Sequence, residues 1–171
     1  MKKILFVCHG NICRSPMAEF IMKDMAVKAG YSVTGVNCGA GERADFVIES
    51  AATSNEEIGN PIYPQARRKL AENGIGVQGN ELGVSAKRSR RVVRDDYDYY
   101  DKIICMDHNN LRNLRRQLGD APEGRLSLML DYADRAGEEV ADPWYTGDFD
   151  ATWRDVTEGC AGLLSQFEFE D

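Results

Sequence analysis

Apolar residues gather in four short runs along the chain. Three of these runs are KKILFVC at 2–8, FVIESAA at 46–52 and KIICMD at 102–107. Short apolar runs bounded by polar or glycine-containing segments are typical of buried strands. A weaker run of the same kind is RLSLML at 125–130. We therefore predict three clear strands and a weaker fourth.

Longer segments between and after these runs carry apolar residues at helical spacing. Those at 16–30, 64–74 and 108–119 each end in a glycine, a residue that commonly stops a helix. The segment 152–167 has the same spacing on one face. The apolar positions of that face are Trp153, Val156, Cys160, Leu163, Leu164 and Phe167. We predict four helices, the last of which closes the fold.

Strands and helices therefore alternate, which predicts an α/β fold. We expect one four-stranded parallel sheet with helices on both faces, because the helices that connect parallel strands cover the sheet. A length of 171 residues suits one core, so we expect a single domain over 1–171. The segments 31–45 and 76–94 show neither period and are predicted to be irregular.

Composition and charge narrow the function classes. The net charge of −7 argues against general nucleic-acid binding, because a phosphate backbone is normally met by a basic surface. No apolar run approaches the length of a membrane span. Five scattered cysteines do not resemble the disulfide framework of a small secreted domain. We expect a cytoplasmic protein with reduced thiols and with no nucleic-acid or membrane partner.

The first strand and the first helix are joined by VCHGNICRSPMAEF at 7–20. In an open parallel sheet, ligands gather beyond the carboxyl ends of the strands. Ser15 followed by Pro16 is a good helix start, with serine as the cap, and the helix would direct its positive end at the loop. Gly10 and Asn11 permit unusual backbone angles that let N–H groups curl around an anion. The sequence therefore predicts a phosphate-binding loop after the first strand.

Two side chains of this loop, Cys8 and Arg14, indicate which reaction it could support. Cys8, near the helix terminus and Arg14, would be stabilised as a thiolate and face the anion as a nucleophile. Arg14 offers a planar fork of donors to two phosphate oxygens, so Cys-x5-Arg indicates phosphoryl transfer through a thiophosphate. One alternative is a structural cysteine beside a capped helix. The other is zinc, but His9 and His108 are the only histidines and have no paired ligand spacing, so we predict no metal and no cofactor.

These residues resemble a known family. CHGNICRSPMAE at 8–19, followed much later by ADPWYTGDF at 141–149, is similar to the low-molecular-weight protein tyrosine phosphatases, and the likeness extends over most of the chain. The resemblance implies a four-stranded parallel sheet flanked by helices and a metal-independent hydrolysis of phosphotyrosine. It also implies that Cys8 is the nucleophile, Arg14 the phosphate clamp and Asp142 the general acid, which later acts as a base.

The resemblance assigns supporting roles as well. It gives Asn11 and Ser50 to the shaping of the phosphate loop and Ser15 to the stabilisation of the thiolate. Two segments depart from the family pattern, because 31–45 and GVQGNELGV at 76–84 are longer than is usual there.

The choice of Asp142 as proton donor rests chiefly on the resemblance. A departing oxygen needs a proton, and an aspartate on a separate loop suits that task. An Asp-Pro pair by itself commonly opens a turn. The spacing leaves four other carboxylates open, namely Asp131, Asp134, Asp148 and Asp150.

Trp144 and Tyr145 follow this acid and predict an aromatic wall against a substrate ring. The alternative is that one or both pack on the domain. A phenolate leaves more easily than an aliphatic alkoxide, so phosphotyrosine proteins or small aryl phosphates are the expected substrates. The expected substrate-binding residues are His9, Gly10, Asn11, Ile12, Cys13, Ser15, Trp144 and Tyr145.

Cys13 lies five residues from Cys8 on the same loop. Oxidation would join the two sulfurs in a reversible disulfide that inactivates the enzyme and protects Cys8 from further oxidation. The alternative is a small buried residue that supports the loop. Loop placement and the resemblance favour the redox role.

A basic run, KRSRRVVR at 87–94, precedes the acidic stretch DDYDYYD at 95–101. Local charge compensation favours a solvated face, and a docking patch for acidic phosphoproteins is the alternative. Tyr97, Tyr99 and Tyr100 in this stretch are expected to pack at the surface, and modification sites are the alternative. The resemblance suggests that Arg90 braces the loops of the active site.

Three other functions compete with tyrosine phosphatase activity. An arsenate reductase on this fold normally needs a closely spaced cysteine pair, whereas the three remaining cysteines are far apart in sequence. In the phosphoarginine phosphatases that this loop also resembles, the position after the asparagine is threonine. This chain has Ile12 there, and its apolar side chain favours a phenyl ring. A phosphotyrosine-binding module without catalysis would need neither Cys8 nor Asp142.

Overall fold

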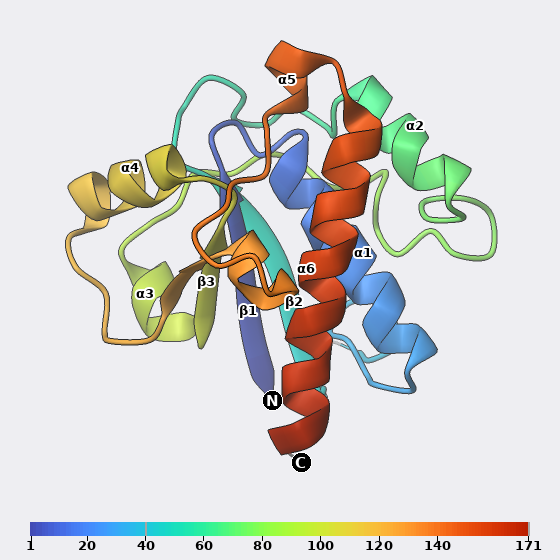
Figure 1. The fold of residues 1–171 in the computed structure, drawn as a ribbon. Coiled ribbons are helices and arrows are strands. Elements are labelled where there is room, and N and C mark those ends of the chain that lie inside the picture. Colours follow the sequence, from blue (N-terminus) through green and yellow to red (C-terminus); the bar gives the residue numbers. More distant parts are fainter. Residues whose placement is uncertain (40, 171) are drawn as a thin grey trace.

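The computed structural model describes residues 1–39 and 41–170 and has an α/β architecture (Figure 1). Within this part of the chain, four strands form one parallel sheet in the order β2-β1-β3-β4. The strands are β1 (Lys2–Cys8), β2 (Phe46–Ala52), β3 (Lys102–Cys105) and β4 (Leu126–Leu128). The predicted fold class is therefore confirmed.

Helices connect and cover these strands. In chain order they are α1 (Arg14–Lys28), α2 (Pro64–Glu72), α3 (Asp95–Tyr99), α4 (His108–Leu118), the 3-10 helix η1 (Met129–Ala133), α5 (Pro143–Thr146) and α6 (Phe149–Glu170). Each of the four predicted helices is present. None of the helices in the described part of the chain is long and apolar enough to cross a membrane.

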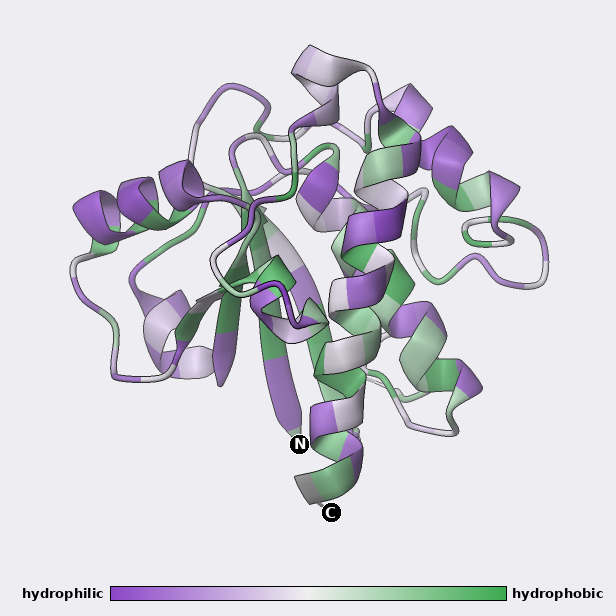
Figure 2. Cartoon of the chain, viewed as in Figure 1, coloured by the Kyte–Doolittle hydropathy of each residue, from purple (hydrophilic) through white to green (hydrophobic). Residues whose placement is uncertain are grey.

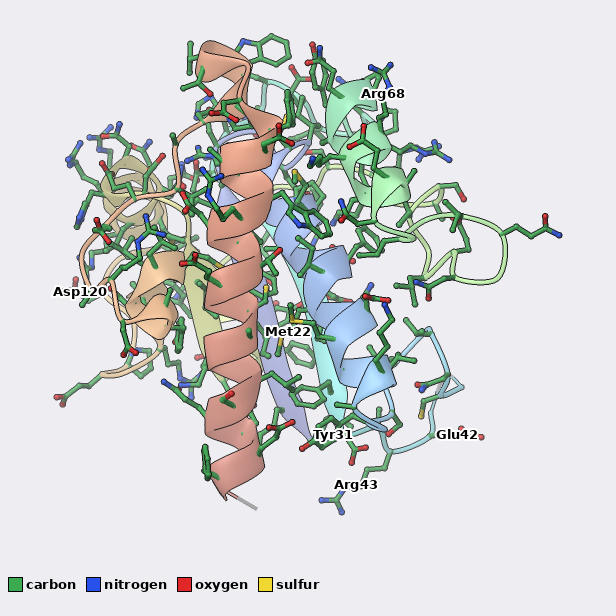
Figure 3. All side chains as sticks on the ribbon, turned by 45° about the vertical axis from the view of Figure 1, so that its right-hand side comes forward. Met22, Tyr31, Glu42, Arg43, Arg68 and Asp120 are labelled. Atoms are coloured by element: carbon green, nitrogen blue, oxygen red, sulfur yellow. The ribbon has the colours of Figure 1, made fainter. Side chains whose placement is uncertain are left out.

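The central strand β1 divides the core into two layers. Its side chains alternate between the faces, so Ile4 and Phe6 pack with α1 and α6, whereas Leu5 and Val7 pack with α3 and α4. Hydropathy colouring shows β1 purple near its N-terminal end and green toward its carboxyl end, while α4 is mostly purple (Figure 2). Met22 of α1 is fully buried and lies between α1 and α6 (Figure 3). Helices therefore cover both faces of the sheet, as predicted.

Several boundaries differ from the predictions. The run at 125–130 is a strand only over Leu126–Leu128 and continues as η1. The closing helix begins at Phe149 rather than at 152, because Asp148 accepts the N–H of Ala151 at 2.9 Å in the manner of a cap.

Two short helices, α3 and α5, were not predicted, because five and four residues are too few for a helical period. Tyr97 and Tyr100, expected at the surface, are buried in the layer beneath α3 and α4. The surface prediction for them is wrong because their rings complete that layer.

The two segments predicted to be irregular contain turns and isolated bridges. In 31–45, Val33 pairs with Phe46 and Thr34 with Cys38; position 40 of this segment lies outside the described residues. The segment 76–94 returns along the end of β2, where Ala52 pairs with Arg91. This return places the basic run beneath the loop that follows β1.

Candidate active site

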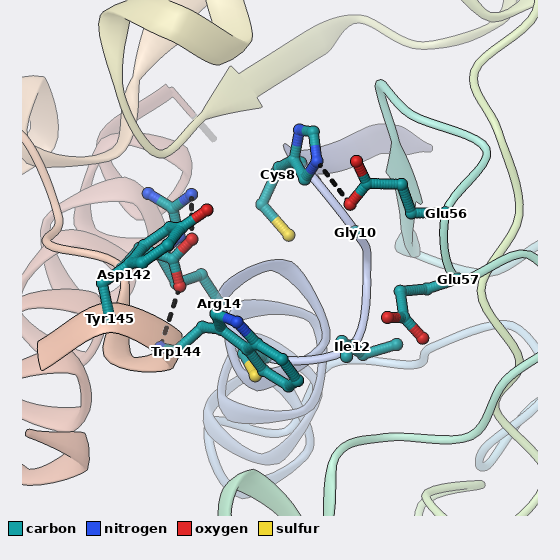
Figure 4. Close-up of a pocket in the computed structure, with 11 residues that line it drawn as sticks. Cys8, Gly10, Ile12, Arg14, Glu56, Glu57, Asp142, Trp144 and Tyr145 are labelled. Carbon is teal, nitrogen blue, oxygen red and sulfur yellow. Dashed lines mark hydrogen bonds and ion pairs between the residues drawn. The ribbon is translucent and has the colours of Figure 1, made fainter. Parts of the chain in front are cut away.

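A pocket opens at the carboxyl end of β1, over the loop 8–14 that leads into α1 (Figure 4). We call this segment the phosphate loop. Three parts of the chain line the pocket: the phosphate loop, the turn after β2, and the start of α5 with its flank. The lining residues are Cys8, His9, Gly10, Ile12, Cys13, Arg14, Glu56, Glu57, Asp142, Trp144 and Tyr145. The structure thus brings the two sequence motifs, more than a hundred residues apart, into one site.

Asn11 sets the curl of the phosphate loop. Its φ of 58° is left-handed, a region that asparagine tolerates better than most residues with a side chain. Its backbone N–H donates to Cys8 Sγ at 3.3 Å. Gly10 does not have a positive φ, contrary to the expectation, and a Cβ there would lie 3.3 Å from Glu57 Cγ, a close approach to that side chain.

Cys8 is buried at the floor of the pocket, with Sγ 3.0 Å from Ser15 Oγ. The predicted cap role of Ser15 is wrong. Helix α1 begins at Arg14, and Cys13 stands at the cap position without a side-chain cap bond. The hydroxyl of Ser15 is engaged instead with Cys8 and with Asn11, whose Nδ2 donates to it at 2.8 Å.

Arg14 is buried and held on the side of the pocket away from β2. Its Nη1 donates to Asp107 Oδ2 at 2.7 Å and to the carbonyl of Val140 at 2.9 Å. Burial lowers the pKa of Arg14, but the negative charges of Cys8 and Asp107 outweigh burial and raise the pKa above its usual value. The guanidinium is therefore a fixed positive charge beside the sulfur.

The carboxylate of Asp142 caps α5 with one oxygen and faces Arg14 with the other. Its Oδ1 accepts the N–H of Trp144 at 3.0 Å, and its Oδ2 lies 3.5 Å from Arg14 Nη2. Its side chain stays partly exposed to the pocket. The four competing aspartates do not line this pocket; Asp150, for example, pairs with Lys69.

Two walls of opposite character rise from the floor (Figure 4). Trp144 and Tyr145 are 54% and 83% exposed, so neither is simply packed on the domain. The Trp144 ring touches Tyr63 edge-on, with centroids 5.1 Å apart, which steadies this wall. The other wall carries Glu56 and Glu57, and His9 Nε2 lies 3.0 Å from Glu56 Oε2.

A polar layer supports the phosphate loop from below. Asn11 Nδ2 also donates to Ser50 Oγ at 2.9 Å, and Ser89 Oγ donates to the carbonyl of Gly10 at 2.8 Å. Arg90 donates its backbone N–H to Asn11 Oδ1 at 3.3 Å and makes a two-pronged ion pair with Asp96. The solvated-face interpretation of the basic run is therefore wrong for its middle part, which is engaged with the protein.

Cys13 lines the pocket but is nearly buried, and burial raises the pKa of its thiol. The protein has no disulfide between the cysteines described, so both loop cysteines are free thiols. Within the described residues, no group of three or more His, Cys, Asp or Glu side chains could hold a metal ion.

Sequence reasoning missed several residues of the site. Asp107 follows strand β3 at the same edge of the sheet as the phosphate loop, a position that could have suggested it. Glu56 and Glu57 follow β2 at the same edge. Val140 takes part only through its carbonyl, for which no sequence signal exists.

Known proteins resemble this chain over nearly its whole length. The profile of a family described as low molecular weight phosphotyrosine protein phosphatase matches residues 3–170. The low molecular weight protein-tyrosine-phosphatase YfkJ of Bacillus subtilis is 34% identical over 171 residues, which covers 99% of this chain and 98% of that protein. The low molecular weight phosphotyrosine protein phosphatase of Rattus norvegicus is 31% identical over 169 residues, covering 96% of this chain and 95% of that protein.

Solved structures give the same picture. The crystal structure of YfkJ superimposes with a TM-score of 0.81 over 100% of this chain and 97% of that one, at 34% identity. The crystal structure of DARP, a Drosophila arginine phosphatase, superimposes with a TM-score of 0.78 over 100% of both chains, at 26% identity.

Proposed function

This chain belongs to the low molecular weight phosphotyrosine protein phosphatases, a class of hydrolases, and on that premise we propose that it hydrolyses phosphotyrosine through a cysteinyl-phosphate intermediate. One observation carries the proposal: Cys8, Arg14 and Asp142 meet in a single pocket beside an exposed aromatic wall. A nucleophile, an anion clamp and a proton donor are the groups that phosphoryl transfer without a metal requires.

In the first step, Cys8 Sγ attacks phosphorus as a thiolate. An S–P bond forms, the P–O bond to the phenol breaks, and Asp142 gives its proton to the departing oxygen. Donors at 3.0 Å and 3.3 Å, from Ser15 Oγ and Asn11 N, stabilise the sulfur anion before attack. Arg14 receives two phosphate oxygens on its fork, because Asp107 and the Val140 carbonyl already fix its orientation.

In the second step, water attacks the phosphorus of the thiophosphate. Asp142, now ionised, takes a proton from that water while the P–S bond breaks and the electron pair returns to Cys8. The products are inorganic phosphate and the starting thiolate. Asp142 ends the cycle protonated and ready for the next substrate.

The aromatic wall favours an aryl substrate. Trp144 and Tyr145 present flat faces to a phenyl ring, and the apolar side chain of Ile12 lines the pocket with them. Phosphotyrosine proteins or small aryl phosphates fit these surfaces. A reactive thiolate works best where thiols stay reduced, which supports activity in the cytoplasm.

A second candidate function is phosphoarginine hydrolysis, favoured by the likeness to DARP, an arginine phosphatase. Ile12 and the aromatic wall argue for a ring instead. Two further rivals have less support. Cys105 and Cys160 are fully buried, which hinders an arsenate-reductase relay, and a mere binding module would not need the thiol and acid that line this pocket.

Hydrolysis of para-nitrophenyl phosphate by the reduced wild type, Cys8→Ser and Asp142→Asn tests the proposal. We expect turnover by the wild type and a loss of about 10⁴-fold or more in Cys8→Ser, because a serine hydroxyl is a far weaker nucleophile than a thiolate. Lack of wild-type turnover would refute phosphatase activity. Turnover that survives in Cys8→Ser would refute the nucleophile assignment.

A substrate comparison separates the two phosphatase candidates. We expect phosphotyrosine to be hydrolysed with a higher kcat/KM than phosphoarginine, and Ile12→Thr to narrow the difference. A strong phosphoarginine preference of the wild type would overturn the substrate assignment while leaving the chemistry at Cys8 intact.

Cys13 is proposed as the redox partner of Cys8. A peroxide would oxidise the Cys8 thiolate to a sulfenic acid, which then condenses with the Cys13 thiol to give a disulfide and water. Peptide mass mapping after peroxide treatment should find Cys8 linked to Cys13, with activity restored by a dithiol. Sulfinic acid on Cys8 without a disulfide would contradict this role.

A further inference from the structure

In the hydrogen bonds beneath the phosphate loop, the donor and the acceptor of each bond can be assigned. Asn11 Nδ2 donates to Ser15 Oγ at 2.8 Å and to Ser50 Oγ at 2.9 Å, which uses both of its hydrogens. Arg90 N donates to Asn11 Oδ1 at 3.3 Å and so fixes which end of the amide is oxygen. Each serine therefore accepts from Asn11 and keeps its own hydroxyl hydrogen for another acceptor.

The two hydroxyls have different acceptors. Ser15 Oγ lies 3.0 Å from Cys8 Sγ, and Ser50 Oγ donates to Glu19 Oε1 at 2.6 Å. Buried hydrogen bonds in a chain polarise and orient one another, so the direction of one bond constrains the next. One branch thus ends on the sulfur of Cys8 and the other on the carboxylate of Glu19.

Glu19 is a buried carboxylate held between two lysines. Lys23, one turn later on α1, donates to its Oε2 at 2.6 Å. Lys87 Nζ lies 3.4 Å from its Oε1 and donates to the carbonyl of Ser50 at 2.8 Å. Both carboxylate oxygens of Glu19 therefore face donors, Oε1 the hydroxyl of Ser50 and Lys87, and Oε2 Lys23.

Lys87 reaches this position because hydrogen bonds hold its segment against the phosphate loop and β2. Next to it, Ser89 Oγ donates to the carbonyl of Gly10, and Ala52 N donates to the carbonyl of Arg90 at 2.7 Å. The ammonium faces Glu19, Arg90 and Lys23; burial lowers the pKa of Lys87, and Glu19 opposes that shift. The middle of the basic run is therefore built into the support of the loop.

We infer that Glu19, paired with Lys23 and Lys87, is a positioning residue that fixes the direction of the hydrogen bonds ending on Cys8. The inference rests on the proposed function, in which Cys8 is the nucleophile. A neutral amide at position 19 turns its donor either toward the lysines, which repel it, or toward Ser50 Oγ. In the second case the hydroxyl of Ser50 loses its acceptor, and its bond with the Asn11 amide is no longer fixed in direction. The hydroxyl of Ser15 is then no longer oriented to donate to Cys8 Sγ.

The test is alkylation of Cys8 by iodoacetamide as a function of pH, followed by peptide mass spectrometry. Glu19→Gln is expected to slow alkylation of Cys8 about tenfold below the midpoint and to move the midpoint up by about one pH unit, the size of one hydrogen bond to an anion. The matched control is Asp24→Asn, which makes the same change five residues along α1, where the carboxylate pairs with Lys28 away from the loop. That variant is expected to keep the wild-type profile.

A second pair of variants keeps the test decisive if Glu19→Gln does not fold. Lys87→Met should move the midpoint in the same direction, and Lys87→Arg, which keeps the charge, should restore it. A purely structural role lowers the melting temperature without moving the alkylation profile. Wild-type profiles in folded Glu19→Gln or Lys87→Met would overturn the inference. Alkylation needs no substrate, so a shifted profile in a protein without phosphatase activity would sink the proposed function and leave this inference standing.

Discussion

The two sides of the phosphate loop meet opposite surroundings. The upper side faces an open pocket, with the exposed Trp144 and Tyr145 on one wall. The lower side carries the side chain of Asn11 and faces Ser50 and other polar groups, which are almost completely buried and bonded to one another. Water or substrate can satisfy a group on the upper side, whereas a buried group has only its protein partners. Upper-side changes should therefore affect catalysis alone, and lower-side changes should affect catalysis and stability together.

Arg14→Lys should have the largest effect on catalysis, at a residue that lines the pocket but is itself buried. Lysine keeps the charge but loses the planar fork that binds two oxygens, so we expect kcat/KM for para-nitrophenyl phosphate to fall about 10³-fold. Steady-state kinetics measure the loss. The control is Arg68→Lys, an exposed position that projects from α2 into solvent, and it should behave as wild type (Figure 3). A loss below tenfold in Arg14→Lys would contradict the clamp.

Asp142→Asn should show an effect that depends on the leaving group. Asparagine can still accept the N–H of Trp144, so the start of α5 is kept while the proton is lost. We expect kcat/KM, which reports the first step, to fall about 10²-fold with phenyl phosphate and less with para-nitrophenyl phosphate, whose leaving group needs less protonation. Equal losses with the two substrates would remove Asp142 from the role of acid.

Ser50→Ala tests the lower side. The substitution leaves one N–H of the Asn11 amide without its acceptor and Glu19 without one of its donors, both in a buried layer. The free energy of unfolding should therefore fall by about 1–3 kcal/mol. Activity should fall with it, by roughly tenfold, because the amide of Asn11 loses one anchor. Urea unfolding and steady-state kinetics on one preparation measure both. The exposed Ser165→Ala on α6 is the control; activity loss in Ser50→Ala without any loss of stability would break the contrast between the two sides.

Tyr145→Ala should have the smallest effect. The ring is 83% exposed, so its removal should leave the free energy of unfolding within about 0.5 kcal/mol of wild type. We expect KM for phosphotyrosine peptides to rise severalfold with little change in kcat, because stacking binds ground state and transition state alike. Tyr99→Ala on α3, outside the pocket, is the control. A fall in kcat with unchanged KM would show that the wall acts in another way.

The predictability of the site follows the same division. Cys8, Arg14 and Ser15 lie within eight residues at a strand-to-helix turn, so local chemistry points to them. The strand and helix alternation likewise predicts the parallel sheet, because hydrophobic periods are local. The fold brings Asp107 to Arg14 across 93 positions and Lys87 to Ser50 across 37. Such partners follow from the register of the sheet and the path of an irregular segment, which no short pattern encodes.

The cap of α1 shows a further limit of local reasoning. Ser15 before Pro16 is a good start signal, yet the hydroxyl turns to Cys8 and Asn11. The same residue type serves as a helix cap or as a donor to a sulfur, and only its neighbours in space decide between the two roles.

Trapping the covalent intermediate tests the central claim most directly. Asp142→Asn, which slows the hydrolysis of the thiophosphate, is mixed with para-nitrophenyl phosphate, quenched in acid within milliseconds to seconds, and digested for peptide mass spectrometry. We expect phosphate on the peptide that contains Cys8, bound to sulfur, at a level that rises and then decays with turnover. Turnover with no phosphate on Cys8 at any time, or phosphate on another residue, would contradict the claim.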